Sequence, residues 1–189
     1  MNRRDFLRRA FAAGGIAALA GFGLSPRAIA DFVRGSGGSA VSTLGHDPGT
    51  TPGSTGTAVG SFARFVAGAN FSAVSLSAYF TASSRSWIGG VYADDAGEPG
   101  ARLAVTSTGT TVANAWNCLA LTASLSIVSG TPYFIGWLAD SGTSIGYGYT
   151  AGTNTRWSCS DTYPTLSDPF NGASTTAREL GVFISSEGC

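Results

Sequence analysis

The sequence contains no lysine, a single histidine and few charged residues. All 11 basic residues are arginine, so Schiff-base and general-base chemistry of lysine is excluded from the chain. The one histidine, His46, lies in a segment rich in glycine, serine, threonine and proline. A catalytic triad needs a histidine held rigidly against its nucleophile, so we expect no triad and no catalytic residues.

The net charge of the chain beyond residue 30 is negative, which is unfavourable for binding a polyanion. Beyond residue 30 the chain has six arginines and ten acidic residues, which gives a negative balance. Nucleic-acid binding needs a clustered basic face that neutralises phosphates. Docking on anionic lipid needs a similar cluster. We therefore expect neither nucleic acid nor a lipid surface as a partner.

Cysteine is also scarce, with Cys118, Cys159 and Cys189 as its only instances. No Cys-x-x-Cys pair occurs, which excludes the usual structural zinc sites. An odd count leaves at least one thiol without an internal partner. Three single disulfides are open from the sequence, and a link from Cys189 to another chain is an alternative.

The first thirty residues read as an export signal. Arginines dominate the start, an apolar stretch interrupted by glycines covers residues 11–24, and Ala28-Ile29-Ala30 supplies a small-x-small cleavage pattern. We expect cleavage after Ala30. About 20 apolar residues are needed to cross a bilayer, and this stretch is shorter, so we expect no stable membrane span after processing. An uncleaved anchor is the alternative.

Residues 3–8, RRDFLR, resemble the motif of twin-arginine (Tat) signal peptides. The match departs from the family at Asn2, where serine or threonine is usual. The resemblance implies the Tat translocase as a partner during export and a periplasmic or extracellular location; a Sec signal is the alternative. The residues that would be recognised are Arg3, Arg4, Phe6 and Leu7.

The rest of the chain divides into a lead-in over 31–58 and a domain over 59–189. The lead-in carries few large apolar side chains. In the domain, residues 73–80 alternate apolar and polar side chains, which predicts a half-buried strand. Turn-rich stretches separate further strand-like segments, which is typical of an antiparallel sandwich or barrel with seven to nine strands. These segments are 87–93, 102–107, 115–122, 132–139, 144–150 and 179–185.

Three sequence runs resemble a bacterial extracellular jelly-roll module. They are 90–104 (GVYADDAGEPGARLA), 116–121 (WNCLAL) and 130–134 (GTPYF). The resemblance extends over residues 62–184 and implies an all-β, antiparallel β-sandwich of jelly-roll type. Modules of this kind are accessory, adhesive or carbohydrate-binding parts of surface, secreted and phage proteins, so the resemblance does not fix one activity.

Acidic residues gather in one turn, at Asp94, Asp95 and Glu98. Carboxylate oxygens at the end of a sandwich can bind calcium. The sequence lacks an Asp-x-Asp-x-Asp-Gly run, and acids in such turns usually shape the backbone. We therefore expect no cofactor, with calcium at this turn as the alternative. Paired carboxylates could also serve a glycoside hydrolase.

Aromatic residues provide the candidate binding surface. Tyr147 and Tyr149 share one pleat face, roughly 7 Å apart at about 3.4 Å per residue. Arg156, Trp157 and Tyr163 follow in a segment rich in polar residues. Sugar rings stack on aromatic faces, whereas the competing interpretation is that these rings belong to the core. We interpret the five residues as a ligand-binding strip.

Together these features predict an exported, non-catalytic binding module that recognises glycan or cell-surface material. Two alternatives remain open. One is a self-assembling structural or adhesive surface protein, for which low charge and abundant serine, threonine and glycine would suit packed β-surfaces. The other is a secreted, carboxylate-dependent glycoside hydrolase.

Overall fold

The computed structural model describes residues 41–46, 54–140, 145–150, 152, 156–175 and 177–189. The export-signal residues Arg3, Arg4, Phe6 and Leu7 and the cleavage position Ala30 lie outside these ranges. Within them, no helix is long and apolar enough to cross a membrane.

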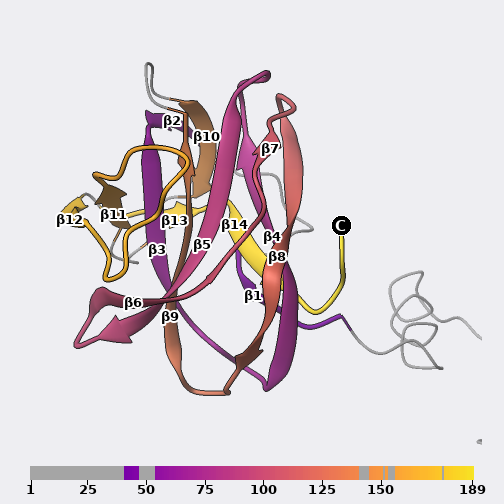
Figure 1. The fold of residues 1–189 in the computed structure, drawn as a ribbon, viewed down its shortest axis with the longest axis vertical. Coiled ribbons are helices and arrows are strands. Elements are labelled where there is room, and N and C mark those ends of the chain that lie inside the picture. Colours follow the sequence, from indigo (N-terminus) through magenta and orange to yellow (C-terminus); the bar gives the residue numbers. More distant parts are fainter. Residues whose placement is uncertain (1–40, 47–53, 141–144, 151, 153–155, 176) are drawn as a thin grey trace, which may run out of the picture. The chain divides into compact units, whose positions relative to one another are not determined.

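The described residues form strands joined by turns and loops (Figure 1). The strands are β1 (Thr43–Gly45), β2 (Ser54–Ala58), β3 (Gly60–Val66), β4 (Phe71–Phe80), β5 (Ser86–Asp95), β6 (Glu98–Val105), β7 (Gly109–Thr110), β8 (Ala115–Ile127), β9 (Pro132–Ala139), β10 (Ile145–Thr150), β11 (Arg156–Cys159), β12 (Gly172–Thr175), β13 (Glu179–Leu180) and β14 (Val182–Ser185).

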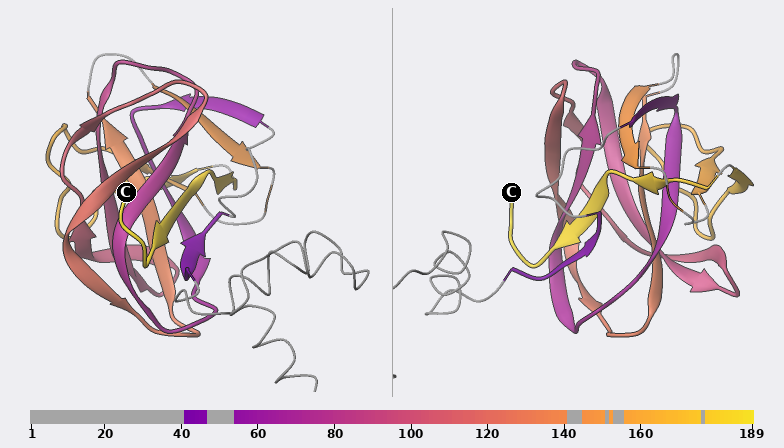
Figure 2. Two further views of the ribbon diagram at one scale, coloured as in Figure 1. Left: turned by 90° about the vertical axis from the view of Figure 1, so that its right-hand side faces the viewer. Right: turned by 180° about the vertical axis from the view of Figure 1, so that it is seen from behind.

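Two antiparallel sheets of seven strands each make up the fold (Figures 1 and 2). In one sheet, here called the first, the order is β1-β14-β4-β10-β13, with β8 paired to β4 and β2 paired to β10. In the second sheet the order is β12-β11-β3-β9-β5-β6, with β7 paired to β5. The chain changes sheet at most of its connections. The predicted all-β antiparallel sandwich is confirmed.

The seven predicted strand segments all occur, but the structure has more strands than the seven to nine expected. The additional ones, apart from β3, have five residues or fewer. Two of them, β1 and β2, pair with β14 and β10 and lie inside the segment 31–58. The sandwich therefore includes residues that the sequence assigned to a lead-in, because short strands of small residues are held by their neighbours and carry little apolar pattern of their own.

The main core lies between the two sheets. On β4, alternation places Leu76, Ala78 and Phe80 inward, and all three are fully buried. From the second sheet, Trp87 and Trp137 meet the Phe80 ring edge-on, with centroid distances of 5.0 and 5.1 Å. Such edge-to-face contacts add to the stabilisation from burial of the rings.

The second sheet is buried on its other face as well. Seven of the eight residues of β9 are buried, without alternation. The segment 160–171, which lies beside β11 and β12 in Figure 1, covers this outer face. A strand covered on both faces shows a continuous apolar run rather than a period of two. The outer cluster consists of Phe62, Ile88, Tyr92, Phe134, Leu138, Cys159 and Leu166.

Cys118 and Cys189 form a disulfide, with a Cα–Cα distance of 5.5 Å across 71 positions of sequence. One of the three pairings left open by the sequence is therefore present. Cys159 is a free, buried thiol. Burial raises the pKa of this thiol to about 12, so it is protonated at neutral pH and behaves as a core side chain.

Candidate functional site

Strand β10 places two tyrosines on one inward face, as their spacing predicts. The Tyr147 ring packs against Trp137 with centroids 5.5 Å apart, and the Tyr149 ring lies 6.0 Å from the Tyr147 ring. Tyr147 is only 1% exposed, whereas Tyr149 is half-buried. The ring of Tyr149 is therefore the outer member of the pair.

Two arginines from other strands converge on this pair. Arg156, the first residue of β11, donates from Nη1 to the Tyr147 hydroxyl oxygen at 2.9 Å. Arg178, just before β13, donates from its own Nη1 to the same oxygen, also at 2.9 Å. The Arg178 guanidinium lies over the Tyr149 ring, 4.2 Å from its centroid, which is a cation–π contact. We call Tyr147, Tyr149, Arg156 and Arg178 the arginine–tyrosine site.

The arginine–tyrosine site carries two like charges in close proximity. Neither arginine has a carboxylate within ion-pair distance among the residues that the structure describes. Each Nη1 lies 2.9 Å from the same oxygen, so the two atoms are at most about 6 Å apart and the two positive charges repel each other. The phenol oxygen and the Tyr149 ring offset part of this repulsion, but they supply no negative charge.

Trp157 and Tyr163, which the sequence placed in the same strip, lie on the other face of the second sheet. Arg156 and Trp157 are neighbours in β11, so their side chains point to opposite faces. Trp157 packs edge-on against Phe134 and Phe170, at 6.4 and 6.3 Å between centroids. Tyr163 is half-buried against the same outer cluster. The structure thus brings together three of the five predicted residues, and adds Arg178.

In the acidic turn between β5 and β6, the Asp94 carboxylate is held by contacts within the protein. Asp94 accepts a hydrogen bond from Arg64 Nε at 2.5 Å and another from the Gly97 N–H at 3.2 Å. The Arg64 guanidinium holds the pKa of the Asp94 carboxyl below its ordinary value. Asp95 and Glu98 are opposite each other in the backbone register of the β5–β6 hairpin. Among the described residues, no three His, Cys, Asp or Glu side chains cluster as metal ligands would.

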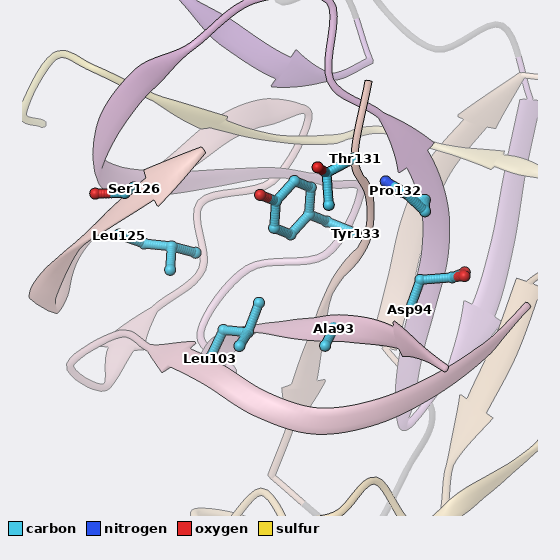
Figure 3. A pocket seen from close by; sticks show the side chains of 8 residues that line it. All are labelled: Ala93, Asp94, Leu103, Leu125, Ser126, Thr131, Pro132 and Tyr133. Carbon is cyan, nitrogen blue, oxygen red and sulfur yellow. The ribbon is translucent and has the colours of Figure 1, made fainter. Parts of the chain in front are cut away.

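A hollow of about 350 Å³ lies between β5, β6, β8 and β9 (Figure 3). Figure 3 shows Leu103, Leu125 and Tyr133 around it, with the Asp94 carboxylate directed away from them. The Tyr133 hydroxyl accepts a hydrogen bond from the Val128 N–H at 3.0 Å. The hollow is therefore largely apolar and has few polar groups to orient a ligand, so it is a weaker candidate than the arginine–tyrosine site.

A second aromatic group lies on the outward face of the first sheet. Trp116 of β8 contacts Tyr79 at 5.6 Å, Phe183 at 5.1 Å and His46 at 6.2 Å, measured between ring centroids. The sequence predicts that Trp116 faces away from the core, because Leu121, five positions on, faces inward. The contact between Trp116 and His46 could not be predicted from the local sequence, because it depends on the pairing of β1, β14 and β4.

The segment 160–171 is anchored by the Asp161 carboxylate. It accepts hydrogen bonds from the Ser167 N–H at 2.8 Å and the Ser167 hydroxyl at 2.5 Å. The Cys159 thiol donates a weaker one, with sulfur and oxygen 3.4 Å apart. Burial raises the pKa of the Asp161 carboxyl, but the hydrogen bonds that it accepts from Ser167, Cys159 and Asn171 together outweigh burial, so the pKa lies below its ordinary value.

We expect Asp161→Asn to lower the free energy of unfolding by about 1–2 kcal/mol at pH 7, because the negative charge and one of the two acceptor oxygens are lost. A lowered native pKa stabilises the fold above the unfolded pKa of about 3.9, and this contribution disappears as pH falls through the native value. The difference between wild type and variant should therefore shrink below about pH 4. Urea denaturation from pH 2.5 to 7 measures it.

The matched control is Asp95→Asn, at an exposed turn position. Surface changes of this kind usually alter stability by less than about 0.5 kcal/mol. A gap between wild type and Asp161→Asn that stays constant across the acid range would contradict the assignment of this carboxylate as the anchor.

Comparison with known proteins finds no match to this chain among family models, curated proteins or solved structures.

Proposed function

We propose that the protein is an exported, non-catalytic binding module that recognises glycan at the arginine–tyrosine site. The observation that carries this proposal is the half-buried Tyr149 ring with the Arg178 guanidinium above it and Arg156 beside it. Binding sites for sugars combine an aromatic surface with a few charged or polar groups that fix orientation. Planar guanidinium groups also donate several hydrogen bonds in fixed directions.

Export through the Tat pathway is part of the same proposal. The Cys118–Cys189 disulfide supports export, because disulfides persist in oxidising compartments outside the cytoplasm. The Tat route itself is proposed from the resemblance of residues 3–8 to Tat signals. Replacing Arg3 and Arg4 by lysine in the full chain would test the route.

A glycan array with the purified full-length protein tests the function. We expect binding to a defined subset of polysaccharides, weakened at least about five-fold by Tyr149→Ala, since ring contacts of this kind contribute about 1 kcal/mol or more. Tyr79→Ala is the matched control, because it removes a half-buried tyrosine on the outward face of the first sheet.

Two results would contradict the proposal. If no glycan on a varied array bound the protein, glycan would be excluded as the ligand. Shortening of a bound polysaccharide during incubation would replace a binding role by a hydrolytic one.

A further inference from the structure

We propose that Arg156, Arg178 and Tyr147 form a binding site for an oxyanion, and that its occupant is the carboxylate of an acidic glycan. The choice of a glycan rests on the proposed function above. The oxyanion itself follows from the hydrogen-bond donors and charges of the arginine–tyrosine site.

Donors exceed acceptors at this site. The Tyr147 oxygen accepts from both guanidinium groups, and its own O–H finds no acceptor among the described residues. The Nε of Arg156 is buried and also has no partner there. Buried donors are normally satisfied, so these unmatched donors call for an acceptor that the described residues do not provide.

Charge points to the same occupant. Both guanidinium groups lie within 2.9 Å of one oxygen, so their positive charges are close together. No carboxylate of the described residues lies within ion-pair distance to balance them. An oxyanion would supply both the negative charge and the acceptor lone pairs, and guanidinium groups bind carboxylate oxygens with two parallel hydrogen bonds.

The side chains of the site are partly exposed. Tyr147 is buried, whereas Tyr149, Arg156 and Arg178 are half-buried, on β10, β11 and just before β13 (Figure 1). One face of the Tyr149 ring is covered by the Arg178 guanidinium, so the sugar ring that carries the carboxylate would contact the part of the Tyr149 ring that remains exposed. An acidic monosaccharide unit would therefore contact both parts at once.

Calorimetry with the full-length protein at low salt, using defined probes, tests the inference. The probes are polygalacturonate, the same polymer with its carboxyl groups reduced to alcohols, a sulfated galactan and inorganic sulfate. We expect polygalacturonate to bind at least about ten-fold more tightly than its reduced form, because hydrogen bonds to a charged group are lost on reduction.

Arg178→Gln should lower the affinity for polygalacturonate at least about ten-fold. Arg64→Gln removes the same charge from the opposite face of the second sheet, where Arg64 pairs with Asp94, and should change the affinity less than two-fold. Tyr147→Phe keeps the buried ring but removes the hydroxyl, and we expect an intermediate loss.

Melting temperatures, measured with and without ligand, distinguish a loss of binding from a loss of folding in the variants. Without ligand, Arg178→Gln should melt close to wild type, because relief of the repulsion between two cations offsets the lost hydrogen bond and cation–π contact. Polygalacturonate should raise the melting temperature of wild type clearly more than that of Arg178→Gln at the same concentration.

The outcomes separate the two proposals. Equal binding of the acidic and reduced polymers overturns the oxyanion inference and leaves the proposed function standing. Sulfate binding that depends on Arg178, with no polysaccharide bound, supports the oxyanion site and overturns the glycan. Preference for the sulfated galactan supports the oxyanion and overturns carboxylate as its form. No binding of any probe overturns the oxyanion inference, and the glycan array then decides the proposed function separately.

Discussion

Reduction of the Cys118–Cys189 disulfide is expected to lower the free energy of unfolding by roughly 4 kcal/mol. The bond closes a loop across 71 positions, and the chain-entropy estimate for a loop of this length lies near that value. Small domains are stable by only about 5–15 kcal/mol in total. The reduced protein should therefore unfold at clearly lower urea concentrations and lower temperatures.

Urea denaturation with and without reductant measures the effect. Cys118→Ala should reproduce the loss, and adding reductant to that variant should cause no further change. Cys159→Ala is the control, because Cys159 is a free thiol and its variant should keep its sensitivity to reductant. The expected loss would be refuted by a midpoint that reductant leaves unchanged in wild type.

The disulfide also makes the stability of the first sheet depend on whether the protein is in an oxidising or a reducing compartment. Cys189 follows β14, which lies between β1 and β4 in the first sheet, and the Ser75 hydroxyl of β4 donates to the Glu187 carbonyl at 2.5 Å. Fixing this end stabilises the pairing of β14 with two neighbours. In a reducing compartment the same sheet would lose that constraint.

The strands that could be predicted from sequence are those with a local signal. Residues 73–80 alternate cleanly, and the expected strand is present as β4, extended by two residues at its start. By contrast, β2 consists of small residues without a large apolar side chain, STGTA, and pairs with β10. Nothing in such a segment identifies its partner, because the pairing depends on the neighbouring strand.

The cover over the second sheet was also missed, although a signal for it exists. The β9 sequence PYFIGWLA is apolar without alternation, which indicates burial on both faces. The residues that provide the cover could not be inferred. Leu166 is 2% exposed, yet it lies in a loop whose placement depends on Arg102, which is 64 positions away in sequence and donates a hydrogen bond to the Leu166 carbonyl.

In the candidate site, too, some features follow from the local sequence and others depend on the pairing of distant strands. Tyr147 and Tyr149 are two positions apart, so their common face follows from the strand period. The same rule indicates that Arg156 and Trp157 cannot serve one surface, a consequence that the predicted strip did not take into account. Arg178 has no such signal, because it is brought to Tyr149 only by the pairing of β13 with β10.

Gly136→Ala is expected to destabilise the protein by about 3 kcal/mol or more. A Cβ at this position of β9 would lie 2.1 Å from the Ser61 carbonyl oxygen and 2.6 Å from the Phe62 Cα. Both atoms belong to the backbone of the adjacent strand β3, so no side-chain rotation relieves the clash. Overpacking a core costs about 1–3 kcal/mol when side chains can adjust, and here the strands themselves must separate.

Gly68→Ala is the matched control, because a Cβ there meets nothing within 4 Å. It should change the free energy of unfolding by less than about 0.5 kcal/mol in urea denaturation. Since Trp137 follows Gly136 and packs on Tyr147, the Gly136 variant should also bind its ligand more weakly. A Gly136→Ala protein as stable as the Gly68→Ala protein would show that β3 and β9 are not in such close contact, and that the arginine–tyrosine site does not depend on it.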